Sequence, residues 1–272
     1  MKGPREPGTL DIMRSEVAGL PGNPERPNED WAAAVLPASG AGGALVLLDG
    51  VTPPAGEVGC VHAVPWFTAR LGGALTELSA SRPDLTLSEI LSLAIRRTAG
   101  LHADTCDLSH VRTPQATVVL ARWDASSVDH LVLSDSVLLL RAPDGSVRAV
   151  RDDRLDRIPR EALRSHAAAD RLRNREGGFF TAAADPSVAE RAVTGTTPRA
   201  GVAALAALTD GASRWVERFG AGDWTECAEL LAREGASALL RRVRALETAD
   251  AAAGGGRRGK VHDDATCVYV EL

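Results

Sequence analysis

The chain has 272 residues, of which 44% are hydrophobic, so it can bury a sizeable core in one large domain or two small ones. A formal net charge of -5 provides no basic surface for nucleic acid or for an anionic membrane. The N-terminus lacks the apolar region of a secretory signal, and no stretch approaches the roughly 18 apolar residues of a membrane span. The four cysteines are widely spaced, as expected of reduced thiols. We therefore expect a cytoplasmic protein in a reducing compartment.

The N-terminal part of the chain predicts strands followed by two helices. Residues 1–28 form a proline-rich lead-in with an edge strand near residues 9–14. Apolar runs at 31–37 and 44–49 flank a Gly-rich loop and predict a hairpin. Apolar residues then recur at steps of three and four, as the buried stripe of a helix requires. They do so over residues 58–79 and 86–103, and Thr86 and Glu89 have the spacing of a capping box.

The rest of the chain repeats this order of strands and then helices. Strand patterns lie at 116–123, 130–141, 146–151, 203–208 and 265–270, helical patterns lie at 223–234 and 236–248, and a charged, partly helical insert lies at 152–175. Strands joined by short turns favour antiparallel sheets, and helices in pairs favour cover on the outside of those sheets. We therefore predict a single α+β domain over residues 1–272, a four-layer α/β/β/α sandwich of two antiparallel sheets flanked by helix pairs.

Acidic residues stand at or beside the ends of several of these apolar runs. They are Glu29 and Asp30, Asp49 before Gly50, Asp135, Asp210 before Gly211, and Asp263 with Asp264. Asp144-Gly145 is excluded, because an Asp-Gly pair between two strand patterns is ordinary hairpin chemistry. A buried carboxylate is costly unless it is paired or coordinates a metal. No matching set of Lys or Arg stands at these strand ends, so the pattern favours hard divalent cations as partners.

These motifs, in this order, resemble those of the metal-dependent protein phosphatases of the PPM (PP2C) family, over nearly the whole chain. The matching segments are Asn28-Glu29-Asp30, Leu48-Asp49-Gly50, Val132-Leu133-Ser134-Asp135-Ser136, Leu208-Thr209-Asp210-Gly211 and Asp263-Asp264-Ala265-Thr266. The resemblance implies hydrolysis of phosphoserine or phosphothreonine in a phosphorylated protein substrate, by a monomer, through a water held between two Mn²⁺ or Mg²⁺ ions.

The resemblance also implies roles for individual residues. One ion would be held by Asp49, Asp210 and Asp263, with Asp49 and Asp210 as the central catalytic acids. The second ion would be held, largely through waters, by Glu29, Asp30, Asp49 and the Gly50 carbonyl. Independently of the resemblance, His62 stands near the start of the helix expected after Asp49, close enough to donate a proton to the leaving alkoxide, with a histidine bonded within the helix layer as the alternative.

Some positions depart from the family pattern. The family's phosphate-binding arginine usually stands where this chain has Glu25, so Arg26 is displaced by one residue. Arg214 stands where the family usually has an acidic ligand, so Asp135 would lack a partner for holding a third ion. We therefore expect two metal ions. Arg214 would either pair with Asp135, bind the substrate phosphate or point into solvent. The alternative function is a phosphatase-fold module with weak or no turnover that binds a phosphoprotein or a signalling partner.

Two short segments also contain potential zinc ligands. Cys60 with His62 and Cys106 with His110 could supply two thiolates and two imidazoles to a structural Zn²⁺. Neither spacing is that of a standard zinc finger, so we expect reduced core cysteines and surface histidines instead.

Overall fold

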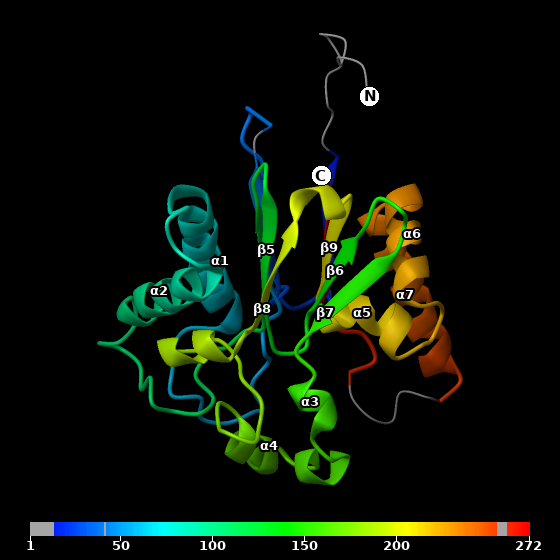
Figure 1. The fold of residues 1–272 in the computed structure, drawn as a ribbon. Coiled ribbons are helices and arrows are strands. Elements are labelled where there is room, and N and C mark those ends of the chain that lie inside the picture. The colour runs from blue at the N-terminus through cyan, green and yellow to red at the C-terminus, as the bar shows by residue number, and fades with distance from the viewer. Residues whose placement is uncertain (1–13, 41, 255–259) are drawn as a thin grey trace, which may run out of the picture.

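The computed structural model describes residues 14–40, 42–254 and 260–272, and its strands form two five-stranded antiparallel sheets (Figure 1). The first sheet has the order β1 (Ser15–Leu20), β10 (Ala265–Glu271), β9 (Ala204–Leu208), β6 (Val137–Arg141) and β7 (Val147–Arg151). The second has the order β2 (Trp31–Val35), β3 (Gly43–Leu48), β4 (Val118–Trp123), β5 (Ser127–Leu133) and β8 (Val193–Pro198).

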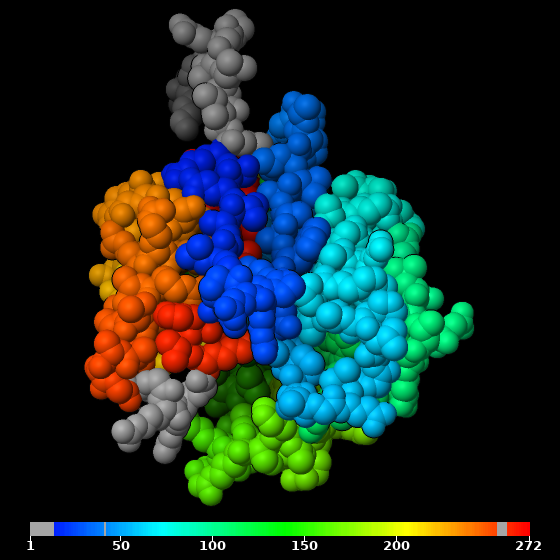
Figure 2. Space-filling view, turned by 180° about the vertical axis from the view of Figure 1, so that it is seen from behind, coloured from blue at the N-terminus to red at the C-terminus, as the bar shows by residue number. Residues whose placement is uncertain are grey.

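Helices cover the outer faces of both sheets (Figure 1). α1 (Val64–Ser81) and α2 (Leu87–Gly100) cover the second sheet, and α5 (Asp210–Glu217), α6 (Trp224–Glu234) and α7 (Ala236–Ala252) cover the first. The connection between β7 and β8 contains α3 (Arg154–Arg157), η1 (Arg160–Leu163), α4 (His166–Leu172) and η2 (Pro186–Arg191), and η3 (Arg199–Gly201) precedes β9. The predicted α/β/β/α sandwich is confirmed. From behind, the N-terminal segment lies between α1 and α7 (Figure 2).

The core explains why the central strands are apolar at every position. Leu45 and Leu47 of β3 pack between the two sheets, whereas Val46 and Leu48 pack under α1 and α2. Because successive side chains of a strand point to opposite faces, a strand that is covered on both faces must be apolar throughout. β3 is therefore apolar up to its end, where it delivers Asp49 to the place where the two sheets meet.

Several predicted elements differ from the observed ones. The run 130–141 is not one strand but parts of β5 and β6, which belong to different sheets. Ser134 turns the chain between them with φ of 71°, and its N–H donates to Asp152 (3.0 Å). Both strands are buried on both faces, so the apolar pattern did not reveal the break.

Other elements were shifted or missed. α1 begins at Val64 rather than near residue 58. The edge strand expected near residues 9–14 lies almost entirely outside the described residues, whereas β1, at the edge of its sheet, was not predicted. β8 was missed because its sequence, VTGTTP, is polar and half exposed. α5 was missed because its first residues, Asp210-Gly211, look like the end of a strand. Within the described ranges, no helix is both long and apolar enough to cross a bilayer.

Candidate functional site

Asp49 and Asp210 lie together where strands of the two sheets end. Asp49 follows β3, and Asp210 begins α5 two residues after β9. The backbone N–H of Asp210 donates a hydrogen bond to the Asp49 carboxylate (3.2 Å). Thr117 holds the end of β3 from the other side, because its hydroxyl accepts the Asp49 N–H (3.3 Å) and its own N–H donates to the Asp49 carbonyl (2.9 Å). Segments 161 residues apart in the chain thus bring two acids into contact.

Asp30 and Asp135 complete a group of four acids. Burial raises the pKa of Asp30 and of Asp135 to about 7 each, and the charge of Asp210 adds to both shifts. Burial likewise raises the pKa of Asp49, with the charges of Asp210, Asp30 and Asp135 contributing. Burial also raises the pKa of Asp210. Mutual repulsion of this kind shows that the structure has brought the predicted acids close together.

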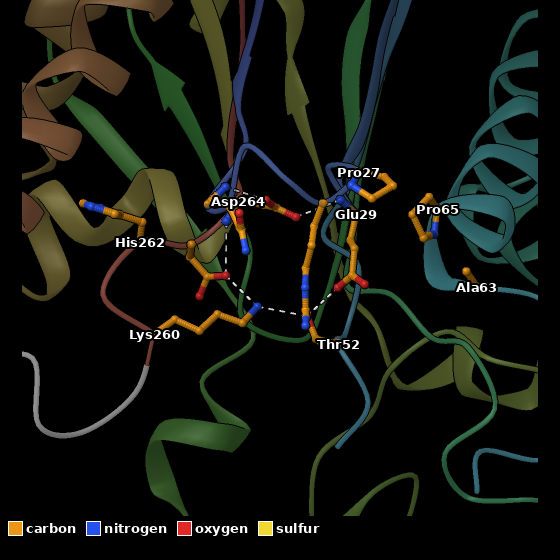
Figure 3. A pocket seen from close by; sticks show the side chains of 12 residues that line it. Pro27, Glu29, Thr52, Ala63, Pro65, Lys260, His262 and Asp264 are labelled. Atoms are coloured by element: carbon orange, nitrogen blue, oxygen red, sulfur yellow. Dashed lines mark hydrogen bonds and ion pairs between the residues drawn. The ribbon is translucent and has the colours of Figure 1, made fainter. Parts of the chain in front are cut away.

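Glu29 and Asp263 line a pocket of about 370 Å³ (Figure 3). The Thr52 hydroxyl donates to the Glu29 carboxylate. The Lys260 ammonium group donates to the Thr52 hydroxyl (2.9 Å) and to the Asp263 carboxylate (2.8 Å), so it bridges the two sides of the pocket. Arg26 is exposed and also lines this pocket. Although the sequence offers no matching set of cations at the strand ends, Asp263 alone of these acids has a lysine partner in the described residues.

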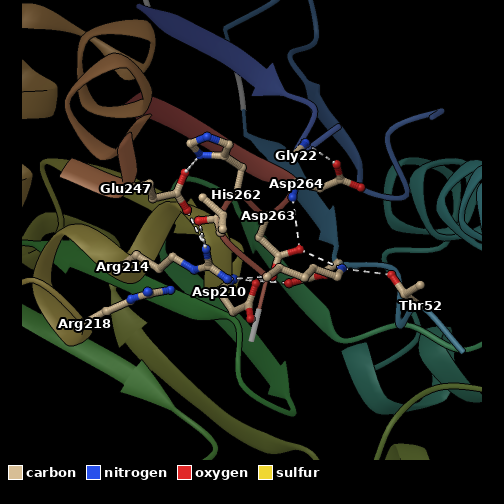
Figure 4. A network of polar contacts seen from close by, with 12 residues as sticks. Gly22, Thr52, Asp210, Arg214, Arg218, Glu247, His262, Asp263 and Asp264 are labelled. Carbon is tan, nitrogen blue, oxygen red and sulfur yellow. Dashed lines mark hydrogen bonds and ion pairs between the residues drawn. The ribbon is translucent and has the colours of Figure 1, made fainter. Parts of the chain in front are cut away.

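Arg214 contacts Asp263 and Glu247 rather than Asp135 (Figure 4). Its guanidinium lies 2.7 Å from the Asp263 carboxylate, and its side chain is only 12% exposed, so the solvent alternative is also wrong. Glu247 of α7 is fully buried, and Arg244 (2.6 Å) and His262 (3.0 Å) contact it as well. Arg214 thus fastens α5 both to α7 and to the segment before β10.

Asp264 has a positioning role that its place beside Asp263 did not reveal. One of its carboxylate oxygens accepts the N–H of Gly22 and the other accepts the N–H of Glu29, both at 2.7 Å. These bonds hold the N-terminal segment against the start of β10. Gly50 approaches Glu29 from the other side, and a Cβ at Gly50 would lie 2.4 Å from the Glu29 carbonyl oxygen. Glycine is therefore required there for close packing.

A second pocket, of about 460 Å³, lies on the Asp135 side of the group. It is lined by Asp135, Asp152, Asp156, Asp210 and Glu217, together with Arg151, Leu155, Val216 and Trp224. Burial raises the pKa of Glu217, although its carboxylate accepts a hydrogen bond from Ser213 (2.5 Å) and lies 2.6 Å from Arg151. Asp135 therefore has an acidic neighbour on α5, Glu217, whose charge also raises the pKa of Asp135.

His62 is placed among cysteines. Its Nδ1 lies 3.7 Å from the sulfur of Cys60 and 3.5 Å from that of Cys106, and its ring stacks on Trp66 with 4.0 Å between centroids. It does not line the pocket that contains Glu29 and Asp263. These contacts favour the alternative role, a histidine bonded within the helix layer, over that of a proton donor.

The donor chemistry of the acidic group suits hard divalent cations. The candidate ligands are carboxylate oxygens, which Mg²⁺ and Mn²⁺ prefer. Both carboxylate oxygens of Asp30 are buried and have no hydrogen-bond partner within the described residues, although the nearby hydroxyls of Thr266 and Thr209 act to lower its pKa. A cation would satisfy these oxygens and relieve the repulsion, so the residues fit such ions.

Sequence reasoning missed Thr52, Lys260, Glu217 and Glu247. Lys260 had a signal, because it and Lys2 are the only lysines of the chain. Glu247 also had one, since it continues the apolar stripe that Leu240 and Val243 form on α7. A carboxylate on such a stripe predicts a buried cationic partner. Thr52 and Glu217 carried no comparable signal.

Comparison with known proteins shows the fold. No protein-family model matches the sequence, and no curated protein is detectably similar to it. Solved structures do match. The serine/threonine phosphatase Stp1 from Staphylococcus aureus has a TM-score of 0.60 at 14% identity, over 100% of this chain and 99% of that one. The catalytic domain of the serine/threonine protein phosphatase PstP, in complex with two manganese ions, has a TM-score of 0.58 at 17% identity, over 95% of this chain and 97% of that one. PppA, a regulatory component of the type VI secretion system in Pseudomonas aeruginosa, has a TM-score of 0.55 at 18% identity, over 96% of this chain and 98% of that one. The chain has the PP2C-type phosphatase fold.

Proposed function

We propose that this protein is a divalent-metal-dependent phosphomonoester hydrolase that acts, as a monomer, on phosphoserine and phosphothreonine in proteins. The convergence of Asp30, Asp49, Asp135 and Asp210 carries the proposal, because buried carboxylates brought this close together offer oxygen ligands to divalent cations, which would neutralise their charge. The shared fold with phosphatases, one of them solved with two manganese ions, supports it.

We assign the metal-holding roles to the acids named from the sequence. Asp49, Asp210 and Asp263 would hold one Mn²⁺ or Mg²⁺ ion, and Glu29, Asp30 and the Gly50 carbonyl would serve a second together with Asp49. When bound, such ions supply Lewis-acid stabilisation and a water of lowered pKa. Asp135 stays outside this two-ion assignment.

The other residues of the site position the ligands and the substrate. The Asp210 N–H orients the Asp49 carboxylate, whereas Thr117 holds the Asp49 backbone and Asp264 holds the Glu29 backbone. Arg26 and Lys260 place positive charge on the wall of the pocket that contains Glu29, where a phosphate monoester would be attracted.

The experiment is hydrolysis of p-nitrophenyl phosphate with and without Mn²⁺. Asp49→Asn and Asp210→Asn should abolish the Mn²⁺-dependent rate without loss of folding, since each keeps its size and loses its charge. Asp144→Asn, in the exposed β6–β7 turn, is the matched control and should keep the wild-type rate. Full activity in either active-site variant would refute the assignment.

A binding module without turnover remains the second candidate. Lys260 and Arg214 already contact both carboxylate oxygens of Asp263, and the Arg26 side chain is exposed. Calorimetric titration with Mn²⁺ separates the two functions. Two bound ions with no hydrolysis of any phosphopeptide would favour the module, and measurable turnover would exclude it.

A further inference from the structure

Two cysteines and two histidines converge outside the acidic group. Candidate ligand atoms of Cys60, His62, His102 and Cys106 all lie within 4.8 Å of one another. The Cys60 sulfur lies 3.7 Å from the Nδ1 of His62 and 3.4 Å from the Nδ1 of His102, and the Cys106 sulfur lies 3.5 Å from the Nδ1 of His62. The two sulfurs are 3.0 Å apart. The chain therefore forms a compact group of two sulfur and two nitrogen donors.

These separations match a tetrahedral metal site. Zinc bonds of about 2.3 Å to sulfur and 2.0–2.1 Å to nitrogen, at tetrahedral angles, place the ligand atoms about 3.4–3.8 Å apart. The three sulfur–nitrogen distances fall in this range. The sulfur–sulfur distance is shorter than that range, but it is well beyond the roughly 2.05 Å of a disulfide.

The local structure presents the four side chains toward one another. Cys60 and His62 lie in the segment between β3 and α1, and His102 and Cys106 lie just after α2. The Cys106 N–H donates to the His102 carbonyl (3.0 Å), so the two residues share one face of a helical turn. The Asp107 N–H donates to the Gly59 carbonyl (2.7 Å) and ties the two segments together.

The histidine rings are held in place. His102 is 3% exposed, and within the described part of the chain its Nε2 is buried without a hydrogen-bond partner. Trp66 stacks on the ring of His62 and meets the ring of His102 edge-on at 5.2 Å between centroids. Held in this way, the rings place the Nδ1 of His62 within 3.7 Å of both sulfurs and the Nδ1 of His102 3.4 Å from the Cys60 sulfur.

We propose that Cys60, His62, His102 and Cys106 bind a structural zinc ion. Two thiolates and two imidazoles form a closed four-ligand set, and zinc is the common metal for such a set. The ion would fasten the segment before α1 to the end of α2. The same segment carries Thr52 and Ala63 of the acidic pocket, so zinc would stabilise one wall of that pocket.

The partner of the cysteines differs from the sequence expectation. His110 had been the candidate fourth ligand, but its Nδ1 accepts the Arg112 N–H (3.2 Å), and its ring packs against Gly59. His102 takes its place because the chain continues one more turn beyond α2. Cys60 and Cys106 are half-buried cluster residues rather than core cysteines.

The test is metal analysis of the full chain purified without chelator or added metal. We expect elemental mass spectrometry to find about one zinc ion per chain. The variants Cys106→Ser and His102→Ala should each lose most of this zinc. Three controls should retain zinc. Cys227→Ser removes a buried cysteine of α6, His110→Ala removes the neighbouring imidazole, and Asp49→Asn separates this site from the acidic one.

A second measurement does not depend on the variants folding. Wild-type protein loaded with Co²⁺ should show the visible absorption of tetrahedral, thiolate-bound cobalt, and Zn²⁺ should displace it. Wild-type protein that lacks zinc and gives no such absorption would overturn the proposal. So would an intact mass lower by two hydrogens, with Cys60 and Cys106 recovered in one disulfide-linked peptide pair.

Discussion

Replacement of Glu247 by Gln tests the network that fixes Arg214 and, through it, Asp263. The Glu247 side chain is fully buried and contacts Arg214, Arg244 and His262. Gln has nearly the same shape but no charge, and its amide group would point hydrogen-bond donors at a guanidinium that has only donors. The substitution therefore leaves two arginines facing a neutral side chain.

The size of the effect follows from the burial of these partners. Removing one member of a buried ion pair costs about 3–5 kcal/mol. The side chains of Arg214 and Arg244 are 12% and 22% exposed, so water can partly solvate their charges after the change. We therefore expect a loss of about 2–4 kcal/mol in the free energy of unfolding. For a chain of this length that lowers Tm by roughly 5–15 °C.

The assay is thermal and urea unfolding of metal-free protein, followed by circular dichroism. Glu234→Gln is the matched control, because Glu234 pairs with Arg242 through side chains that are 41% and 50% exposed. Such a pair contributes at most about 1 kcal/mol. Equal unfolding free energies for the two variants would refute the argument that Glu247 organises this part of the structure.

Two further predictions concern charge near the proposed metal ions. The raised pKa values of Asp30 and Asp135, about 7 in the folded state against an ordinary 3.9, mean that the folded metal-free protein binds more protons than the unfolded chain. The Tm of the metal-free protein should therefore fall as pH rises from 5 to 8. Saturating Mn²⁺ should remove this fall, and Asp30→Asn should reduce it. A metal-free Tm that stays flat or rises over this range would contradict the raised pKa values. Lys260→Gln removes an ammonium group that competes for the Asp263 carboxylate through a half-exposed contact, so the Kd for Mn²⁺ should fall two- to fivefold, an effect of about 0.4–1 kcal/mol. Calorimetry checks this, and weaker binding would show that Lys260 supports the metal rather than competing with it.

The layered fold could be predicted because its signals are local. The capping box at Thr86 and Glu89 forms as predicted, with the Thr86 hydroxyl accepting the Glu89 N–H and the Glu89 carboxylate accepting the Thr86 N–H. The apolar run before Asp49 predicted a strand, and β3 forms there. The position of Ser134 could not be predicted, because the strands on each side of it are equally apolar and only the tertiary structure assigns them to different sheets.

The acids of the site could be found from their positions at strand ends, but their partners could not. Arg214 reaches Glu247 across 33 residues and Asp263 across 49. The place of Glu247 on the apolar stripe of α7 indicates a buried cationic partner, but nothing local identifies Arg214 as that partner. His102 lies 40 residues from His62, and its contact with Cys60 depends on how the chain leaves α2. Side-chain pairs that arise from the packing of distant segments require the three-dimensional structure.

The most direct test of the proposed function is phosphate release from a phosphothreonine peptide by metal-free protein, measured before and after addition of Mn²⁺. Release that begins only with Mn²⁺, stops with chelator and is absent in Asp49→Asn is the predicted result. Release that persists in chelator, or that Asp49→Asn retains in full, would contradict the claim that the converging carboxylates hold the catalytic ions.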